Sequence, residues 1–227
     1  LLLIFYLYLY TYRRKLLDNL RHVFFFVILM AIITSGAFLV LQYAPVGYIY
    51  LIPFAWCPVI ARVFYDSRTA IFVHIITVFI VSIAVPAPYV FLFMQVLTGI
   101  VAVISLRDMT QRAQLAKTAA FILLAYSLLY TAVTVLTTGS ITDLDYRLYF
   151  YFAINAVLVI CSYGLIFLFE RTFGLLSNIT LVELTNVNSN LMLEFAEKAP
   201  GTFQHSLQVS NLATEAAKRI GAKVLLV

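Results

Sequence analysis

Charged residues are scarce in this sequence. Asp, Glu, Lys and Arg make up only 11% of its 227 residues, whereas 63% are hydrophobic. Soluble domains carry roughly 25% charged and 45–50% apolar residues. A soluble chain of this length could not hide so much apolar surface, because roughly a quarter to a third of the unfolded surface stays exposed after folding. The composition therefore excludes an ordinary soluble domain and predicts that a lipid bilayer surrounds most of the chain.

Cysteine is also rare, and a signal-peptide pattern is absent. Cys57 and Cys161 both lie inside apolar runs, without the CxxC spacing of a metal or redox site. We therefore exclude a disulfide framework and expect both to behave as small buried hydrophobes. The sequence starts without Met, within an apolar run, and stops without a closing loop. We expect both ends to be cuts in a longer protein.

Long apolar runs fill the first three quarters of the chain. A membrane helix needs about 20 mostly apolar residues. Pro53 and Pro58 interrupt one run, and the sequence Pro86-Ala87-Pro88 separates two others as a tight hairpin would. The first run is shortened at its start. We predict seven spans, at residues 1–12, 23–43, 47–65, 69–85, 89–106, 118–138 and 148–169.

The basic residues alternate between the predicted loops. One side of the predicted membrane carries Arg13, Arg14, Lys15, Arg21, Arg62, Arg68, Arg107, Arg112 and Lys117. The other side carries only Arg147, beside Asp143 and Asp145. Cytoplasmic loops carry the excess of Lys and Arg. We therefore predict a multi-pass protein of the inner or plasma membrane, with its N-terminus outside and its C-terminus in the cytoplasm. This placement also accounts for the net charge of +5 without DNA or RNA as a partner.

The composition becomes polar near residue 171. We divide the chain into a membrane region at 1–170, a cytoplasmic linker at 171–190 and the start of a helical domain at 191–227. Residues 179–184 fit a short strand or an extended linker. Asn188 or Ser189 can cap a helix over 191–199, in which Glu194 and Lys198 pair. The sequence Pro200-Gly201 then predicts a break, and Thr202 is the expected N-cap of a second helix that ends at Gly221.

His74 is the clearest ionisable residue within a predicted span, roughly 8 Å from its cytoplasmic start at 1.5 Å rise per residue. Such residues are costly in a membrane and often functional, for example in proton relays. The alternative is a histidine that faces the bundle and is hydrogen-bonded to a neighbouring helix. No predicted span contains a carboxylate partner for it.

His205 precedes an apolar stripe on the second predicted helix, and it lies on the same helical face. Residues three and four apart share a face, and the stripe contains Val209, Leu212, Ala213, Ala216 and Ile220. A histidine there would point towards the core on which this helix packs. Position alone favours a packed core histidine. A metal ligand is the alternative, but one histidine does not define a metal site.

Residues 197–213 read Glu-Lys-Ala-Pro-Gly-Thr-Phe-Gln-His-Ser-Leu-Gln-Val-Ser-Asn-Leu-Ala. This stretch resembles the opening of the HD hydrolase domain in the seven-transmembrane receptors with an intracellular HD domain. The resemblance implies an all-α, seven-helix membrane bundle followed by the first helices of a cytoplasmic HD-type domain. It also implies an extracellular sensory domain before Leu1 and the naming His-Asp pair after Val227. His205 would be the first metal ligand, whereas Gln204 stands where members often have a second histidine.

The resemblance implies a membrane-tethered phosphodiesterase that cleaves the cyclic dinucleotide cyclic di-AMP, with a divalent metal pair, Mn or Fe, as its cofactor. We expect the segment alone to lack a complete active site and to be inactive. Two alternatives remain open at this point: a transporter or channel, and a nucleotide sensor without catalysis. The sequence also leaves the oligomeric state open, a homo-oligomer included.

Overall fold

A computed structural model describes residues 1–106, 113–184, 188–222 and 224 of the chain. The described residues are helical and contain no β-strand, as expected for an all-α protein. They divide into two compact units, Leu1–Leu175 and Leu176–Val227. Two residues of the predicted basic loops, Arg107 and Arg112, lie outside the described part, as do residues 185–187 and Leu225–Val227 in the polar segment.

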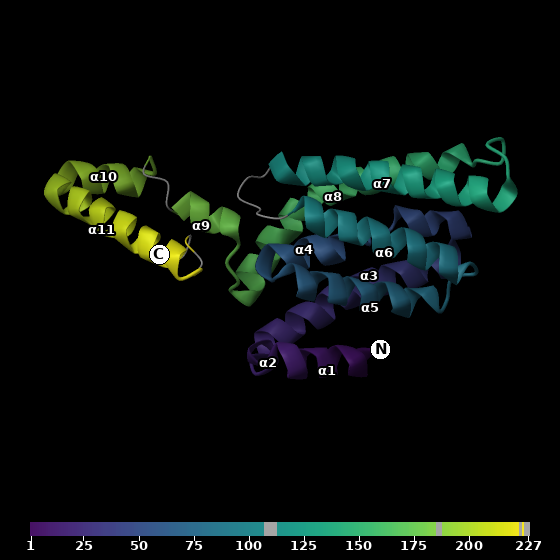
Figure 1. Cartoon of the computed structure of the whole chain (residues 1–227), viewed down its shortest axis with the longest axis horizontal. Coiled ribbons are helices and arrows are strands. Elements are labelled where there is room, and N and C mark those ends of the chain that lie inside the picture. The colour runs from purple at the N-terminus through teal and green to yellow at the C-terminus, as the bar shows by residue number, and fades with distance from the viewer. Residues whose placement is uncertain (107–112, 185–187, 223, 225–227) are drawn as a thin grey trace. The chain divides into compact units, whose positions relative to one another are not determined.

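The first unit is an apolar helical bundle (Figure 1). Its elements are α1 (Leu2–Tyr12), α2 (Arg14–Leu17), α3 (Leu20–Tyr43), the 3-10 helix η1 (Val46–Leu51), α4 (Trp56–Phe64), α5 (Ser67–Ser82), α6 (Pro88–Ser105), α7 (Ala113–Thr138) and α8 (Tyr146–Phe173). In the bilayer every backbone N–H and C=O group must be satisfied internally. Uninterrupted apolar runs therefore form helices.

Five stretches of the described chain are long and apolar enough to cross a membrane. They are Leu20–Tyr43, Val46–Phe64, Pro88–Ser105, Ala113–Thr138 and Tyr146–Phe173. The apolar helices α1 and α5 are shorter, with 11 and 16 residues. At 1.5 Å per residue α5 extends about 24 Å, less than the roughly 30 Å of hydrocarbon. The chain is a multi-pass membrane protein, and the count of seven spans stays a prediction.

Consecutive helices pack as hairpins. Each of the pairs α4 and α5, α5 and α6, α6 and α7, and α7 and α8 is in contact. Pro88 is the first residue of α6, a position at which proline costs no hydrogen bond. The predicted interruption near Pro53 is present, because η1 ends at Leu51 and α4 begins at Trp56. α3 and α8 complete the bundle by packing on η1, α4 and each other.

Aromatic rings join α3, α4 and α8 at one end of the bundle. The ring of Phe25 is fully buried. Its centroid lies 5.1 Å from that of Phe169, 5.3 Å from Tyr65 and 5.6 Å from Phe64. The pairs with Phe64 and Phe169 are edge-to-face and the pair with Tyr65 is tilted, and aromatic pairs of this kind add to the stabilisation that burial provides. The cluster fixes the end of the bundle at which α8 leaves it.

α8 continues past residue 170, at which the sequence places the end of the membrane region. It ends at Phe173, and Gly174 adopts the left-handed conformation with φ of 64°, which glycine tolerates at a helix C-terminus. Cys57 is buried as expected, but Cys161 on α8 is exposed. The prediction that Cys161 is buried was wrong. An apolar side chain on a membrane helix can face lipid instead of the bundle.

The second unit contains α9 (Asn178–Leu184), α10 (Asn190–Lys198) and α11 (Pro200–Arg219). The prediction of a strand or extended linker at 179–184 was wrong. The hydroxyl oxygen of Ser177 accepts a hydrogen bond from the backbone N–H of Thr180 at 3.3 Å, which starts a helical turn. Ile179 and Leu181 are buried. Capping and burial outweigh the weak strand preference of the β-branched residues here.

The ends of α10 and α11 differ partly from the prediction. Ser189 occupies the N-cap position of α10 without a side-chain capping bond, and the predicted Lys198–Glu194 pair is confirmed at 2.6 Å. The break predicted at Pro200-Gly201 lies at Ala199 instead, and α11 begins at Pro200 rather than after Thr202. Proline suits the first helical position, where its fixed φ and missing N–H cost nothing.

α11 carries apolar residues on two opposite faces. Phe203, Leu207 and Ala217 lie on the face that packs within the unit, and the Phe203 ring meets Phe195 of α10 edge-on at 5.7 Å. The predicted stripe is on the other face, where Val209 and Leu212 are 51% and 74% exposed. The described part of the unit therefore packs on the face that the sequence analysis did not select.

Candidate functional site

His205 lies on the exposed face of α11, in line with the uncovered apolar stripe. The expectation that it points into a core is wrong for the described part of this chain, because α11 packs through the opposite face. Among the described residues, no three His, Cys, Asp or Glu side chains lie close enough to hold a metal ion. These residues thus supply one exposed imidazole. They do not by themselves fit a metal pair, which needs several protein ligands.

His74 is buried in the bundle at 1% exposure. Its Nε2 lies 2.9 Å from the backbone oxygen of Gln95 on α6, so Nε2 carries the proton and donates. Gly99 lies one turn further along α6, and a Cβ there would overlap the imidazole ring. His74 thus faces the bundle and is hydrogen-bonded to a neighbouring helix, which is the second of the two interpretations that the sequence left open. Its Nδ1 has no partner among the described groups.

Gln95 extends this polar contact to α7. The Tyr126 hydroxyl donates to the Gln95 side-chain oxygen at 2.5 Å, and both residues are buried. The Gln95 Nε2 and the Thr98 hydroxyl have no partner within the described part of the chain. In a low-dielectric interior such contacts hold helices together strongly, and unpaired groups are costly. One polar cluster therefore connects α5, α6 and α7 at membrane depth.

Asn155 of α8 binds backbone groups at the interruption between η1 and α4. Its Nδ2 donates to the backbone oxygens of Tyr50, at 3.1 Å, and Ile52, at 2.9 Å. The indole nitrogen of Trp56 donates in return to the backbone oxygen of Leu158, at 2.7 Å. The broken helix frees backbone groups that the membrane cannot satisfy, and a neighbouring helix supplies partners for them.

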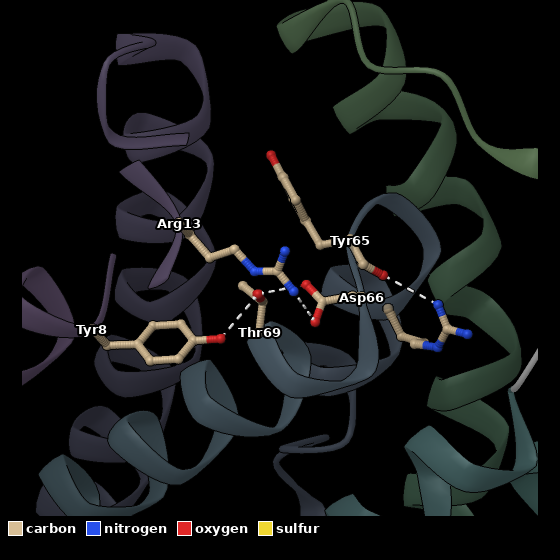
Figure 2. A network of polar contacts seen from close by, with 6 residues as sticks. Tyr8, Arg13, Tyr65, Asp66 and Thr69 are labelled. Carbon is tan, nitrogen blue, oxygen red and sulfur yellow. Dashed lines mark hydrogen bonds and ion pairs between the residues drawn. The ribbon is translucent and has the colours of Figure 1, made fainter. Parts of the chain in front are cut away.

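A third polar group joins the end of α1 to the start of α5 (Figure 2). Arg13 forms an ion pair with Asp66 at 2.5 Å. The Thr69 hydroxyl donates to the other Asp66 oxygen at 2.7 Å. Because that proton is used, the Tyr8 hydroxyl must donate to Thr69 Oγ1, at 3.2 Å. The ion pair brings the first and third predicted basic loops to the same end of the bundle.

The Arg13–Asp66 pair is half-exposed, with 38% of each side chain accessible. Partial burial raises the pKa of Asp66, but the Thr69 hydrogen bond and the Arg13 charge outweigh it, so the net pKa is lowered. Burial lowers the pKa of Arg13, whereas the Asp66 charge raises it, and the net direction is upward. Both groups are therefore held in their charged forms.

Asp66, Gln95 and Asn155 were not predicted from the sequence to take part in these contacts. A signal existed for each of them. Gln95 and Asn155 are the only side-chain amides in their predicted spans, and Asp66 is the only acid between the two basic residues of its loop, Arg62 and Arg68. Counting polar residues within apolar helices would have selected the two amides. Their partners could not be read from spacing, since the contacts join residues far apart in the chain.

Residues 1–177 match the family described as the 7TM receptor with intracellular HD hydrolase. The chain is 33% identical over 190 residues to the cyclic-di-AMP phosphodiesterase PgpH of Listeria monocytogenes, covering 78% of this chain and 25% of that protein. It is 26% identical over 235 residues to PgpH of Bacillus subtilis, covering 95% of this chain and 32% of that protein.

An uncharacterised protein of Synechocystis is 47% identical over 58 residues, which covers 26% of this chain and 7% of that protein. No solved structure matches the chain significantly. The chain spans about a quarter to a third of the length of the two phosphodiesterases. Because the family match covers most of the sequence, the chain belongs to the family of 7TM receptors with an intracellular HD hydrolase.

Proposed function

We propose that this chain is part of a membrane-tethered phosphodiesterase that hydrolyses cyclic di-AMP at the cytoplasmic face of the membrane. The observation that carries the proposal is the similarity to the Listeria phosphodiesterase over 190 residues. The membrane bundle would anchor the enzyme, and a segment around residues 171–190 would connect it to the catalytic domain. The chain itself would contribute the first helices of that domain.

The exposed apolar face of α11 would be the surface on which the rest of the HD domain packs. Val209, Leu212 and Ile220 leave an apolar stripe uncovered there, and His205 lies in line with it. In a longer protein, further helices of the HD domain would cover the stripe and enclose the imidazole. The alignment with the Bacillus phosphodiesterase covers 95% of this chain, so it includes the helix that carries His205.

We include in the proposal a divalent metal pair, Mn or Fe, with His205 as one ligand. The remaining ligands would come from residues outside this sequence. When bound, such a metal pair would supply Lewis-acid chemistry for the phosphodiester and for a water molecule.

The test uses the full-length parent protein, purified in detergent with Mn²⁺ or Fe²⁺ and assayed for cyclic di-AMP cleavage. His205→Ala should lower the rate about 100-fold or more, since even residues that only support metal ligands cost 10–100-fold. Gln208→Ala, an exposed change on the same helix, should leave the rate nearly unchanged. Absence of hydrolysis by the unaltered protein, or equal rates for the two variants, would contradict the proposal.

A nucleotide sensor without catalysis is the second candidate, and Gln204 is the observation that favours it. A degenerate site should purify without metal and should bind cyclic di-AMP without cleaving it. Metal analysis of the full-length protein, with nucleotide binding measured in parallel, separates the two candidates. Bound metal that is lost in His205→Ala favours the enzyme.

A further inference from the structure

Two hollows adjoin at the end of α1. The first, of about 330 Å³, is lined by Tyr8, Tyr12, Arg13 and Arg68. The second, of about 560 Å³, shares Tyr12 and Arg13 and is lined in addition by Thr11, Arg14, Lys15, Leu16, Tyr65 and Asp66. Together they form one concave surface between α1, α2 and the start of α5, which we call the α1–α5 hollow.

The α1–α5 hollow has an excess of positive charge. Four of its lining residues are basic and one is acidic. Asp66 is already engaged by Arg13 and Thr69. Within the described residues, no carboxylate forms an ion pair with Arg14, Lys15 or Arg68. The hollow therefore offers an anion three cations that have no carboxylate partner, although the Arg14 guanidinium also lies over the Tyr10 ring, 5.4 Å from its centroid. Arginine guanidinium groups match a phosphate geometrically.

The surroundings indicate which kind of anion fits. α1 contacts α2 and α5 and leaves apolar side chains uncovered, among them Leu3 at 69% and Leu7 at 50% exposure. Tyr12, at the rim of the hollow, is 73% exposed, as is typical of tyrosine at a membrane interface. The basic hollow thus begins where an exposed apolar helix ends, at the level at which acyl chains meet headgroups.

We propose that the α1–α5 hollow binds the phosphate of an anionic phospholipid headgroup, with the acyl chains along the exposed side of α1. Basic clusters next to a membrane helix attract anionic lipids. The Arg13–Asp66 pair shapes the floor of the site, whereas Arg14, Lys15 and Arg68 supply its free charge. A bound headgroup would connect α2 to α5 and would add to the contacts that already hold α1 on the bundle, among them Tyr8 on Phe72 at 4.1 Å and Phe5 on Phe26 at 5.6 Å.

The test measures thermal unfolding of the purified full-length protein in detergent while short-chain phosphatidylglycerol is titrated in. A ligand that binds only the folded state raises the melting temperature. Short-chain phosphatidylcholine and inorganic phosphate are titrated separately. We expect a clear rise with phosphatidylglycerol and little with either of the others. An equal rise with inorganic phosphate would show a site for soluble anions and overturn the lipid assignment.

The triple variant Arg14→Gln/Lys15→Gln/Arg68→Gln should weaken apparent binding of phosphatidylglycerol about 100-fold, since each basic residue near anionic lipid contributes about fivefold. Arg68→Gln alone should weaken it about fivefold, and it keeps the test valid if the triple variant fails to fold. A response equal to that of the unaltered protein in both variants, or no response in the unaltered protein, would overturn the proposal.

The matched control removes three positive charges from α10 and α11 instead, as Lys198→Gln/Lys218→Gln/Arg219→Gln. It changes the net charge by the same amount and leaves the α1–α5 hollow intact. We expect it to retain the response to phosphatidylglycerol. If it lost the response as fully as the triple variant, net charge rather than a built site would explain the effect, and the proposal would fail.

Discussion

At the scale of single residues, Gly99 allows the His74 imidazole to pack between α5 and α6. The imidazole occupies the space in which a side chain at Gly99 would project, and it donates to the Gln95 backbone one turn away. Burying a histidine in an apolar bundle costs less when a polar ring atom finds a partner, as His74 Nε2 does in the Gln95 carbonyl oxygen. Gly99 therefore permits a polar contact between α5 and α6 that a larger residue would prevent.

Gly99→Ala should destabilise the protein by about 1–3 kcal/mol, the usual cost of inserting a methyl group into a packed core. Gly164→Ala on α8 is the matched control, because no atom lies within 4 Å of the added Cβ. It should be neutral or stabilising, since alanine favours a helix. Thermal unfolding in detergent measures both. Equal melting temperatures for the two variants would contradict the packing described for His74.

Asp66→Asn should lower the free energy of unfolding at pH 7 by at most about 1 kcal/mol, the range for exposed ion pairs. The pKa of Asp66 is lowered from its ordinary value of 3.8. The stabilisation that the ionised carboxylate gives to the folded state is therefore complete above that value. It disappears as the pH falls through the lowered pKa of the folded state. The stability difference between the two proteins should thus be constant from neutral pH towards pH 5 and shrink in stronger acid. A difference that grows on acidification would argue against the ion pair.

At the scale of helices, α8 stabilises the interruption between η1 and α4. Asn155 binds the two carbonyl oxygens that the interruption exposes. The proline-containing segment is thereby tolerated inside an apolar bundle, and the position of α4 depends on α8.

Asn155→Leu should cost about 1–3 kcal/mol, because it removes the Asn155 donor from the part-buried Tyr50 carbonyl oxygen and leaves the Ile52 oxygen with only the Phe54 N–H. Ser162→Ala, also on α8, is the control. Its buried hydroxyl has no partner among the described residues, so its loss should change little. Unfolding in detergent, followed by circular dichroism, compares the variants. A smaller loss for Asn155→Leu than for Ser162→Ala would contradict the role of Asn155.

Much of the helical pattern could be predicted from the sequence. Apolar runs must form helices in a bilayer, and the turn at Pro86-Ala87-Pro88 follows from residues that favour helix ends. The segment at 179–184 was mispredicted because Ile179, Thr180 and Val182 are β-branched, whereas capping by Ser177 and burial decide its structure. The two apolar faces of α11 could not be ranked, since periodicity detects a face but not what covers it.

The candidate sites were less predictable than the helices. The Arg13–Asp66 and Asn155–Tyr50 contacts join residues far apart in the chain, and no local spacing encodes them. The metal-ligand role of His205 came from a resemblance and stays a prediction, because a metal site is defined by several ligands together.

At the scale of the whole molecule, the chain is a membrane bundle followed by a polar helical unit that exposes an apolar stripe. In the full-length protein, Leu212→Ala should lower stability by about 2–5 kcal/mol if the proposed domain covers the stripe. In the isolated 227-residue chain, where Leu212 is 74% exposed, the same change should be nearly neutral. Unfolding midpoints of both lengths provide the comparison. Equal effects in the two would argue against a covering domain.

The most direct test determines on which side of the membrane the turn before α8 lies and on which side α11 lies. Cysteine is introduced at Thr142, in the exposed turn before α8, or at Gln208 on α11, in a Cys161→Ser background. Intact cells are treated with a membrane-impermeant maleimide. We expect labelling at position 142 in intact cells and at position 208 only after lysis. Labelling of position 208 from outside would contradict it, because the proposed catalytic domain would then lie outside the cell.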